Sequence, residues 1–425
     1  MLDIKFIRDN SKKVERACQE KNVKVDIDEL LDIDRRRREA LQGIEDMRAK
    51  KNKANKEIQK TASSREKNKI ILEMKELDRN SDRLDKNLKD LEKKFHKLMY
   101  ELPNIPFNEV PSGKDENDNV VVKEVGEKTR FNFNPKDYLE VAESLDLIDV
   151  KRAAKVSGTR FGYLKNEAAL LEFALINLAF DTLVKEGFIP VIPPVMLRPE
   201  MLEKSGHLSE RDKPERYFIE KDNVYLAGTA EQPIAGMHAD EVFEEKDLPR
   251  RYLGFSTCFR REAGAYGKDT RGILRVHQFD KIEMFSICHP EKTREEHEFL
   301  LSCQEKLMNA LKIPYRVINI CTGDLGFPAA ACYDIEAWLP KENRYRETHS
   351  TFNDTDFQTR RLNIRYRDSK TKKLEFAHAL NGTAFAIGRI IIAIIENYQQ
   401  KDGSVQIPEA LQHYLKGLKM IRKEN

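Results

Sequence analysis

The sequence predicts an α+β protein in which a hairpin of two long helices precedes a domain built on a largely antiparallel β-sheet flanked by helices. Three observations lead to this expectation: a heptad pattern within residues 27–100, a polar linker at 103–119, and β-rich alternating segments mixed with amphipathic helices beyond it. This mixture is typical of α+β domains. We expect an N-terminal arm over 1–105 and a second domain over 106–425.

The second long helix of the hairpin carries the clearest pattern. Its apolar positions step alternately by four and three residues, which is the a/d seam of an antiparallel coiled coil held over four repeats. The seam consists of Ile70, Met74, Leu77, Ser81, Leu84, Leu88, Leu91, Phe95 and Leu98. Such a helix requires a partner helix.

The first long helix supplies this partner less regularly. Leu30, Leu41, Ile44 and Ile58 fall in register, whereas charged residues occupy further seam positions, namely Arg37, Arg48 and Lys51. The short polar stretch TASS at 61–64 fits the tip of an antiparallel helical hairpin. Together the two patterns predict a two-helix coiled-coil arm.

Basic residues gather around the tip of this arm. They are Arg48, Lys50, Lys51, Lys53, Lys56, Lys60, Arg65, Lys67 and Lys69, against only Glu57 and Glu66. Charge on a coiled-coil surface commonly serves solvation alone, but a single dominant sign at one end favours a phosphate-binding surface. We therefore predict that the tip contacts nucleic acid.

The overall composition excludes several classes of protein. The 425 residues have a formal net charge of +3, and the longest apolar run, IIIAII at 390–395, is too short to cross a bilayer. The N-terminus MLDIKFIRDN lacks the apolar region of a signal peptide. We expect a cytoplasmic protein with no membrane partner.

The cysteines do not form a metal-binding pattern. The six thiols are scattered along the chain without a C-x-x-C pair, at Cys18, Cys258, Cys288, Cys303, Cys321 and Cys332. Scattered cysteines in a protein without a secretory signal are typically reduced and buried. We expect neither disulfides nor zinc.

The stretch FRREAGAYGKDTRGILRVHQFDKIE, from residue 259, concentrates charge between two apolar segments. If 254–262 and 273–287 are strands joined by a glycine-rich loop, residues two apart share a face. One face then carries Arg260 and Glu262 from the first strand, and Arg275, His277, Phe279, Lys281 and Glu283 from the second. These residues could form a salt-bridge ladder, or the arginines and the ring could bind a purine polyphosphate.

The stretch ALNGTAFAIGRIIIAIIENYQ at 379–399 predicts a helix that is apolar on nearly every side and hence buried. Arg389 is its only charge before Glu396. A buried arginine requires an anionic or stacking partner. This partner could be an internal carboxylate or a bound nucleotide.

Several of these segments resemble known motifs. FRREAG with RVHQFDKIE resembles motif 2 of class II aminoacyl-tRNA synthetases, NGTAFAIGR resembles their motif 3, and GFIPVIPPVML at 187–197 resembles motif 1, the dimer segment. GTAEQP at 228–233, YDIEAWLP at 333–340 and the helical arm are similar to those of the bacterial-type seryl-tRNA synthetase family. The similarity covers essentially the whole chain.

The resemblance implies a site for ATP and magnesium. Arg260 would hold the α-phosphate and the substrate carboxylate, Phe279 and Arg389 would enclose the adenine, and Glu347 with Ser350 would ligate Mg²⁺. Arg260, Glu347 and Arg389 would be the catalytic residues. The implied ATP contacts are Arg260, Arg261, Glu262, Arg275, Val276, Phe279, Glu347, Thr348, His349, Ser350 and Arg389.

The resemblance also implies a site for L-serine. Its residues would be Thr229, Ala230, Glu231, Arg260, Glu283, Asn381 and Thr383. A pocket built to hydrogen-bond a hydroxyl rejects the analogue that lacks it, by roughly 10⁴ to 10⁵, because its polar groups would remain unpaired. The implied reaction is formation of seryl-adenylate from serine and ATP, followed by transfer of serine to the 3′ end of tRNA(Ser).

The partners implied by the family are RNA and a second copy of the chain. The arm would recognise tRNA(Ser), and also tRNA(Sec) where one exists, through Lys50, Lys51, Lys53, Lys56, Lys60 and Arg65, while Arg271 would contact the acceptor stem. Motif 1 implies a homodimer. The chain departs from bacterial relatives at His349 and Thr351, where serine and cysteine are usual, and at Thr383, where many have serine.

Two other functions compete with this interpretation. A serine-activating relative that loads a carrier protein would keep motifs 2 and 3 but would lack the arm. A coiled-coil RNA-binding scaffold with an inactive domain would show erosion of Arg260, Glu262, Glu283, Glu347 or Arg389, and all five are present.

Overall fold

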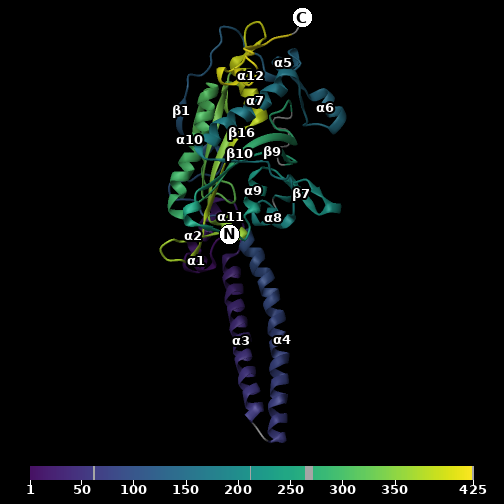
Figure 1. The fold of residues 1–425 in the computed structure, drawn as a ribbon, viewed down its shortest axis with the longest axis vertical. Coiled ribbons are helices and arrows are strands. Elements are labelled where there is room, and N and C mark those ends of the chain that lie inside the picture. The colour runs from purple at the N-terminus through teal and green to yellow at the C-terminus, as the bar shows by residue number, and fades with distance from the viewer. Residues whose placement is uncertain (61–62, 211, 264–270, 424–425) are drawn as a thin grey trace. The chain divides into compact units, whose positions relative to one another are not determined.

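The structure, a computed structural model, describes residues 1–60, 63–210, 212–263 and 271–423. It contains two compact units: Leu2–Pro103 forms one, and Asn104–Asn425 together with Met1 forms the other. The first unit is helical, and the second combines a mostly antiparallel sheet with helices (Figure 1). The predicted α+β class is confirmed.

The helical unit begins with two short helices, α1 (Ile4–Asp9) and α2 (Ser11–Glu20). Two long helices follow, α3 (Ile27–Lys60) and α4 (Ser64–Glu101), which run side by side as a hairpin (Figure 1). At the start of α4, the Ser63 side chain accepts a hydrogen bond from the Glu66 backbone N–H, an N-terminal cap. Thr61 and Ala62 of the predicted tip lie outside the described residues.

The seam predicted for α4 faces α3. Leu88, Leu91 and Phe95 are buried there, and the rest of the predicted seam is half-buried. In α3 the pattern corrects two predictions. Leu41 is exposed and Ala40 is buried in its place, and Arg48 is exposed beside a half-buried Met47. The reason is geometric, because alternating steps of three and four from Leu30 lead to Ala40 and Met47.

Two charged residues of α3 do lie along the seam, as predicted. The Arg37 guanidinium lies 4.4 Å from the centroid of the Phe95 ring. This cation–π contact stabilises the charged side chain at the seam. Lys51 forms an ion pair with Asp78 of α4. Both cations therefore keep a partner on the facing helix, and this explains why the heptad pattern of α3 is interrupted by charge.

Leu91→Ala tests this packing. Removing the buried side chain should lower the opening free energy of α3 and α4 by about 2 to 5 kcal/mol, the range for a large-to-small core substitution. Hydrogen exchange of the full-length protein measures it. The exposed Lys94→Ala is the matched control and should change protection by less than about 0.5 kcal/mol. Equal protection in both variants would contradict the seam.

The second unit is organised by an eight-stranded sheet. Its strand order is β1 (Val120–Val125), β11 (Tyr315–Asn319), β12 (Ala331–Leu339), β13 (Arg344–Thr355), β16 (His378–Ala386), β10 (Gln278–Cys288), β9 (Arg250–Phe259) and β4 (Ile189–Val191). All neighbouring pairs are antiparallel except β4 with β9. The predicted antiparallel sheet is thus present, with one parallel strand added at its edge.

Three long helices cover this sheet: α7 (Asn166–Leu183), α10 (Thr293–Leu311) and α12 (Ile387–Tyr398). They share one hydrophobic core with the central strands. The smaller helices are α5 (Tyr138–Ser144), α6 (Val150–Ser157), α8 (Pro199–Lys204), α9 (Glu231–Met237), α11 (Phe357–Leu362) and α13 (Glu409–Gln412). No helix in the described ranges is long and apolar enough to span a bilayer.

Within the described residues, short strands form four further small sheets. They are β2 (Ile148–Asp149) with β3 (Tyr163–Leu164); β5 (Met196–Leu197), β6 (Phe218–Ile219) and β7 (Val224–Leu226); β8 (Val242–Glu244), β14 (Arg365–Arg367) and β15 (Leu374–Phe376); and β17 (Val405–Gln406) with β18 (Met420–Ile421).

The hairpin predicted from strands 254–262 and 273–287 differs from the structure where each strand meets the connecting loop. The first strand ends at Phe259 and the second begins at Gln278, so 260–262 and 273–277 are not strands. Glu262 has a positive φ of 50°, which turns the chain away from extended geometry. The 273–277 segment bonds elsewhere: the Ile273 N–H donates to the Tyr138 hydroxyl (2.9 Å) and the His277 N–H to the Arg160 carbonyl (3.0 Å). Residues 264–270 of the connecting loop lie outside the described chain.

Glu396 is a buried carboxyl in α12, which packs in the main core. It accepts a hydrogen bond from the Lys341 backbone N–H (3.0 Å), and burial raises its pKa to about 7. Because a carboxyl is ordinarily titrated near pH 4.5, the folded state binds more protons than the unfolded state between these pH values. The contribution of Glu396 to stability therefore falls as the pH rises from about 4.5 to about 7.

Glu396→Gln should raise the melting temperature of the protein at pH 8 relative to wild type and should bring little gain at pH 5. Calorimetric unfolding at both pH values measures the difference. The exposed Glu140→Gln serves as control and should leave the pH dependence unchanged. A gain that is the same at both pH values would contradict this account.

Candidate active site

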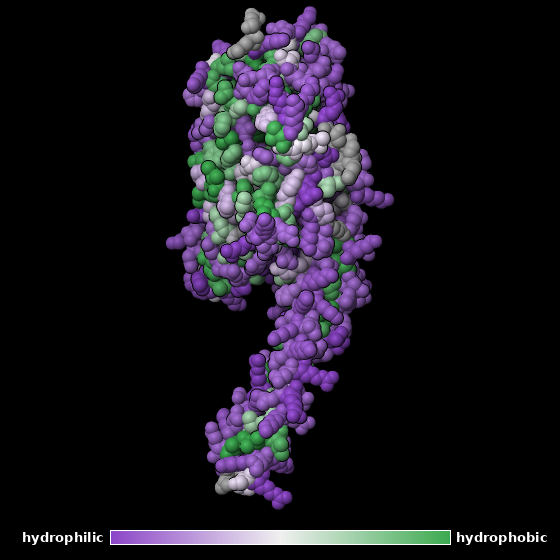
Figure 2. All heavy atoms as spheres, turned by 90° about the vertical axis from the view of Figure 1, so that its right-hand side faces the viewer, coloured by the Kyte–Doolittle hydropathy of each residue, from purple (hydrophilic) through white to green (hydrophobic). Residues whose placement is uncertain are grey.

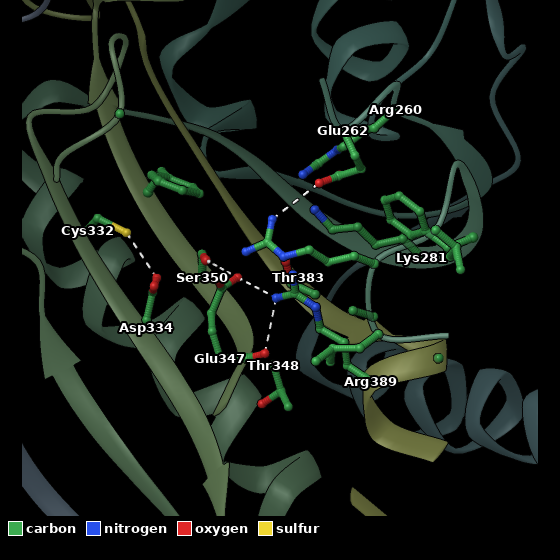
Figure 3. A pocket seen from close by; sticks show the side chains of 18 of the residues that line it. Arg260, Glu262, Lys281, Cys332, Asp334, Glu347, Thr348, Ser350, Thr383 and Arg389 are labelled. Atoms are coloured by element: carbon green, nitrogen blue, oxygen red, sulfur yellow. Dashed lines mark hydrogen bonds and ion pairs between the residues drawn. The ribbon is translucent and has the colours of Figure 1, made fainter. Parts of the chain in front are cut away.

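A cavity of about 470 Å³ lies over the strands β10, β12, β13 and β16 and the first turn of α12. Ten of the residues predicted from the sequence line it, together with Lys281, Cys332 and Asp334, which were not assigned to the site (Figure 3). The ten are Arg260, Glu262, Arg275, Val276, Phe279, Glu347, Thr348, Ser350, Thr383 and Arg389. Polar and charged groups thus converge from segments far apart in the sequence.

Arg389 lies at the cavity wall and pairs with Glu347. Its Nη1 donates to Glu347 Oε1 (2.8 Å) and to the Glu347 carbonyl (3.1 Å), as Figure 3 shows. Its side chain is 26% exposed, so the expectation of a fully buried arginine was wrong, because the start of α12 opens onto the cavity. Burial disfavours charge on Glu347, but the charge and hydrogen bond of Arg389 hold the pKa of Glu347 below its ordinary value.

The other two cavity arginines are arranged differently. Arg275 forms an ion pair with Glu262 (Nη1 to Oε2, 3.2 Å). The Arg260 guanidinium lies 5.5 Å from the centroid of the Phe279 ring, and its Nε donates to the Gly228 carbonyl (3.2 Å). Among the described residues no carboxylate lies within ion-pair distance of Arg260. The cavity therefore offers one cation that is available to an anionic ligand.

The opposite wall gathers oxygen atoms. Asp334 on β12 is directly opposite Ser350 on β13, and the Ser350 hydroxyl donates to Glu347 Oε1 (3.4 Å). The Cys332 thiol donates to Asp334 (3.3 Å), and burial together with the nearby charge of Glu347 raises the pKa of Asp334 well above its ordinary value. Asp334 and Glu347 are neighbouring carboxylates whose negative charges repel each other. Such a pair fits a hard divalent cation such as Mg²⁺.

A second, more enclosed polar cluster adjoins Arg260. The Thr229 hydroxyl donates to Glu283 Oε2 (3.0 Å), and Glu283, which is 1% exposed, also forms an ion pair with Lys281. Thr383 on β16 is paired in register with Glu283 on β10. Burial raises the pKa of Glu283, while Lys281 and Thr229 oppose this shift. The cluster presents a carboxylate and two hydroxyls within a small buried volume.

Glu231 is the second buried carboxylate of this cluster. It stands at the start of α9, next to the buried Ala230, and is held by two residues that sequence analysis missed. His207 Nε2 lies 3.0 Å from Glu231 Oε1, and Gln358 Nε2 donates to the same oxygen (2.6 Å). Burial opposes ionisation, but these contacts lower the pKa of Glu231. No sequence spacing links positions 207, 231 and 358, so only the fold reveals this arrangement.

Other predicted contacts lie away from the cavity lining. His349 is fully buried, and its Nδ1 lies 2.8 Å from the Thr348 hydroxyl. Burial lowers the pKa of His349 to about 3, so the ring is neutral. Asn381 is buried and its amide donates to Asp354 (3.4 Å). Arg261 is exposed and stacks over Tyr217, with 5.6 Å between guanidinium and ring centroid.

The predicted RNA-contacting residues are mostly exposed. On the arm, Lys51 is engaged with Asp78, whereas the others project to solvent: Lys50, Lys53, Lys56, Lys60 and Arg65. Arg271 is exposed beside the segment 264–270, which is not described. On the face shown in Figure 2, most of the surface of the helical unit is hydrophilic.

The comparisons with known proteins agree with this fold. The family described as tRNA synthetase class II core domain (G, H, P, S and T) matches residues 217–398, and the Seryl-tRNA synthetase N-terminal domain matches residues 1–106. A sheet of this topology, with motif 2 and motif 3 residues around one cavity, is therefore a class II aminoacyl-tRNA synthetase core.

Full-length relatives narrow this class to one family. The chain is 46% identical to a serine–tRNA ligase of Dictyoglomus turgidum over 99% of both chains, and 45% identical to one of Thermobifida fusca over 98% of this chain and 97% of that one. A crystal structure of seryl-tRNA synthetase from Pyrococcus horikoshii complexed with ATP has a TM-score of 0.93, 42% identity and full coverage of both chains. The chain belongs to the seryl-tRNA synthetase family, which is a family of enzymes.

A second solved structure is also similar over the whole chain. The crystal structure of cytoplasmic serine–tRNA ligase from Naegleria fowleri in complex with AMP has a TM-score of 0.88 and 33% identity, with 100% of this chain and 99% of that chain covered.

The Arg389–Glu347 pair can be tested by titration. In Arg389→Gln the carboxyl loses its adjacent cation, so the pKa of Glu347 should rise. NMR titration with labelled glutamate carboxyl carbons would follow it. Arg344→Gln, which removes an exposed arginine paired with Glu342, should leave the Glu347 titration unchanged. If the two variants titrate alike, Arg389 does not set the charge state of Glu347.

Proposed function

We propose that this protein activates L-serine with ATP and transfers it to the 3′ end of tRNA(Ser). The observation that carries the proposal is the juxtaposition of two sites: a cavity with the dimensions of a nucleotide site, and a buried Thr229–Glu283 cluster adjoining Arg260. Family membership supports the same reaction. In the first step a serine carboxylate oxygen attacks the α-phosphorus, and pyrophosphate leaves with the electrons of the broken P–O bond.

The nucleotide roles follow the cavity geometry. Arg260, which has no ion-pair partner in the described chain, would bind the carboxylate and the α-phosphate and stabilise charge as the bond forms. Phe279 and Arg389 would enclose the adenine, and Arg275 would bind the terminal phosphates. The remaining contacts would come from Arg261, Glu262, Val276, Thr348, His349 and Ser350. His349 would act from behind the wall, through its contact with Thr348.

Magnesium would be held by Glu347 and Ser350, with Asp334 adjacent. When bound, a magnesium ion would neutralise the phosphate oxygens of ATP. The protein's own groups would do the rest by positioning: the strand β13 holds Glu347 and Ser350 on one wall, and Arg389 keeps Glu347 ionised.

The serine roles follow the buried cluster. Glu231 and Glu283 would bind the ammonium and hydroxyl groups of the substrate, and Thr229 and Thr383 would complete the small volume, beside Ala230 and Asn381. A hydroxyl-binding site of this kind rejects alanine because its buried polar groups would be left unpaired. The methyl group of Thr383 narrows the space further, which favours serine over threonine.

In the second step a hydroxyl of the terminal ribose of the tRNA would attack the carbonyl carbon of seryl-adenylate, and AMP would leave. The N-terminal arm over 1–105 would bind the tRNA through the exposed cations of its tip, and the domain over 106–425 would carry the chemistry. We include tRNA(Sec) as a second acceptor, a homodimer as the working assembly, and the cytoplasm as its location.

Variants of the two sites should separate activation from RNA binding. Arg260→Ala should abolish serine-dependent pyrophosphate exchange and leave tRNA binding unchanged. Lys50→Ala with Lys53→Ala should weaken tRNA binding about 10-fold or more, since phosphate contacts dominate such affinity, and leave exchange intact. Filter binding and exchange assays measure the two. Equal loss of both activities in either variant would contradict the division.

The acceptors can be tested with purified RNA. Aminoacylation assays on tRNA(Ser), tRNA(Sec) and a tRNA without a long variable arm should give serine transfer to the first two only. Transfer to the third at a comparable rate would contradict recognition by the arm.

A further inference from the structure

Arg216 carries a guanidinium group that has no part in the functions proposed above. It follows the segment after α8 and is half-buried, yet its Nε is buried and has no hydrogen-bond acceptor within the described residues. No carboxylate of the described chain forms an ion pair with it. Burying a cation without a partner is costly, so such a group in a folded protein points to an anion that binds there.

The position of Arg216 is defined by Gly228. A Cβ atom at Gly228 would collide with Arg216 Nη1 and would lie 3.3 Å from its Cζ, so the guanidinium packs directly on this glycine. The carbonyl of the same glycine accepts the Nε–H of Arg260 at 3.2 Å. Two arginines therefore flank a single residue, immediately before Thr229.

The backbone around Arg216 is tied to motif 2. The Arg261 N–H donates to the Glu215 carbonyl (3.0 Å), and the Ala263 N–H donates to the Glu215 carboxylate (3.1 Å). The Leu226 N–H donates to the Tyr217 carbonyl (3.0 Å), which joins the segment to β7 as well. These bonds fix residues 215–217 beside the chain that carries Arg260, and so the two cations are held together rather than approaching by chance.

The charges near Arg216 leave this pair short of anions. Burial, followed by the charge of Arg260, lowers the pKa of Arg216, while the carboxylates of Asp212, Glu231 and Glu215 oppose the shift. Glu231 is already engaged by His207 and Gln358. An anionic ligand between the two guanidiniums would relieve their repulsion.

We propose that Arg216 is a second substrate-binding arginine, which together with Arg260 holds the carboxylate of the amino acid at the point where it meets the α-phosphate. The inference rests on the proposed function, since it assigns the anion as the serine carboxylate. Arg216 packs on Gly228 and Arg260 donates to the carbonyl of the same glycine, so the two carboxylate oxygens would each have a guanidinium donor.

The test compares two ligands that differ in one charge. Binding of L-serine and of L-serinamide, which lacks the carboxylate, is measured by calorimetry on the full-length protein with magnesium and α,β-methylene-ATP. Arg216→Ala should weaken serine binding by about 10- to 100-fold, the range for loss of a charge-assisted hydrogen bond, and change serinamide binding by less than about 2-fold. Arg216→Lys should recover part of the loss.

The control is Lys213→Ala, which removes an exposed cation on the same segment, paired with Glu210. It should leave both ligands unaffected. Equal weakening of serine and serinamide by Arg216→Ala would indicate a merely structural role and would overturn the proposal, as would unchanged serine binding. If Arg216→Ala does not fold, Arg216→Gln gives the same comparison. Wild-type protein that binds neither ligand would instead refute the proposed function itself.

Discussion

The pairing of β10 with β16, and of β16 with β13, is the constraint on which the site depends. These three central strands bring Glu283, Thr383 and the segment of Glu347 into one part of the sheet, although they are up to 100 residues apart in the chain. A slip of one residue would turn every side chain to the opposite face. The strand register that buries the core side chains therefore also positions the residues of the active site.

Close packing extends this constraint to the helix α9. A Cβ atom at Gly254 on β9 would lie 2.5 Å from the Ile234 side chain and 3.1 Å from Ala230, so only glycine allows α9 to approach the sheet this closely. Because Thr229 and Glu231 stand at the start of α9, their distance from Glu283 depends on this contact. The Thr229–Glu283 hydrogen bond depends on it as well.

The charged residues of the site fall into two groups: acids that have a partner, and arginines that have no carboxylate partner among the described residues. Three acids of the site have partners: Arg389 pairs with Glu347, Lys281 pairs with the buried Glu283, and His207 and Gln358 contact the buried Glu231. Removing one partner would leave a charge uncompensated in a poorly hydrated environment, which is strongly destabilising. Arg260 and Arg216 lack such partners in the described chain, so the excess positive charge collects at one place. This is where an anionic substrate would be held.

Much of the architecture could be predicted from the sequence, because it depends on periodicity and on contiguous motifs. The heptads predicted the helical pair, motifs 2 and 3 supplied seven residues of the cavity, and the family resemblance added Glu347, Thr348 and Ser350. Two errors arose where the pattern allowed two positions for a side chain. Ala40, and not Leu41, lies in the seam of α3. Arg389 belongs to an apolar helix, but its side chain lines the cavity and is partly exposed. His207, Gln358, Asp334 and Arg216 were missed because each becomes significant only through contacts between distant segments.

The central claim is that the buried cluster selects serine for adenylation. Pyrophosphate exchange into ATP tests it most directly, with wild-type protein, magnesium and serine, threonine, alanine, glycine and cysteine assayed side by side without RNA. The account predicts exchange with serine, and exchange with alanine lower by roughly 10⁴-fold, since a hydroxyl-binding pocket rejects the analogue without the hydroxyl. Folded protein that supports no exchange, or that exchanges equally well with alanine, would contradict it.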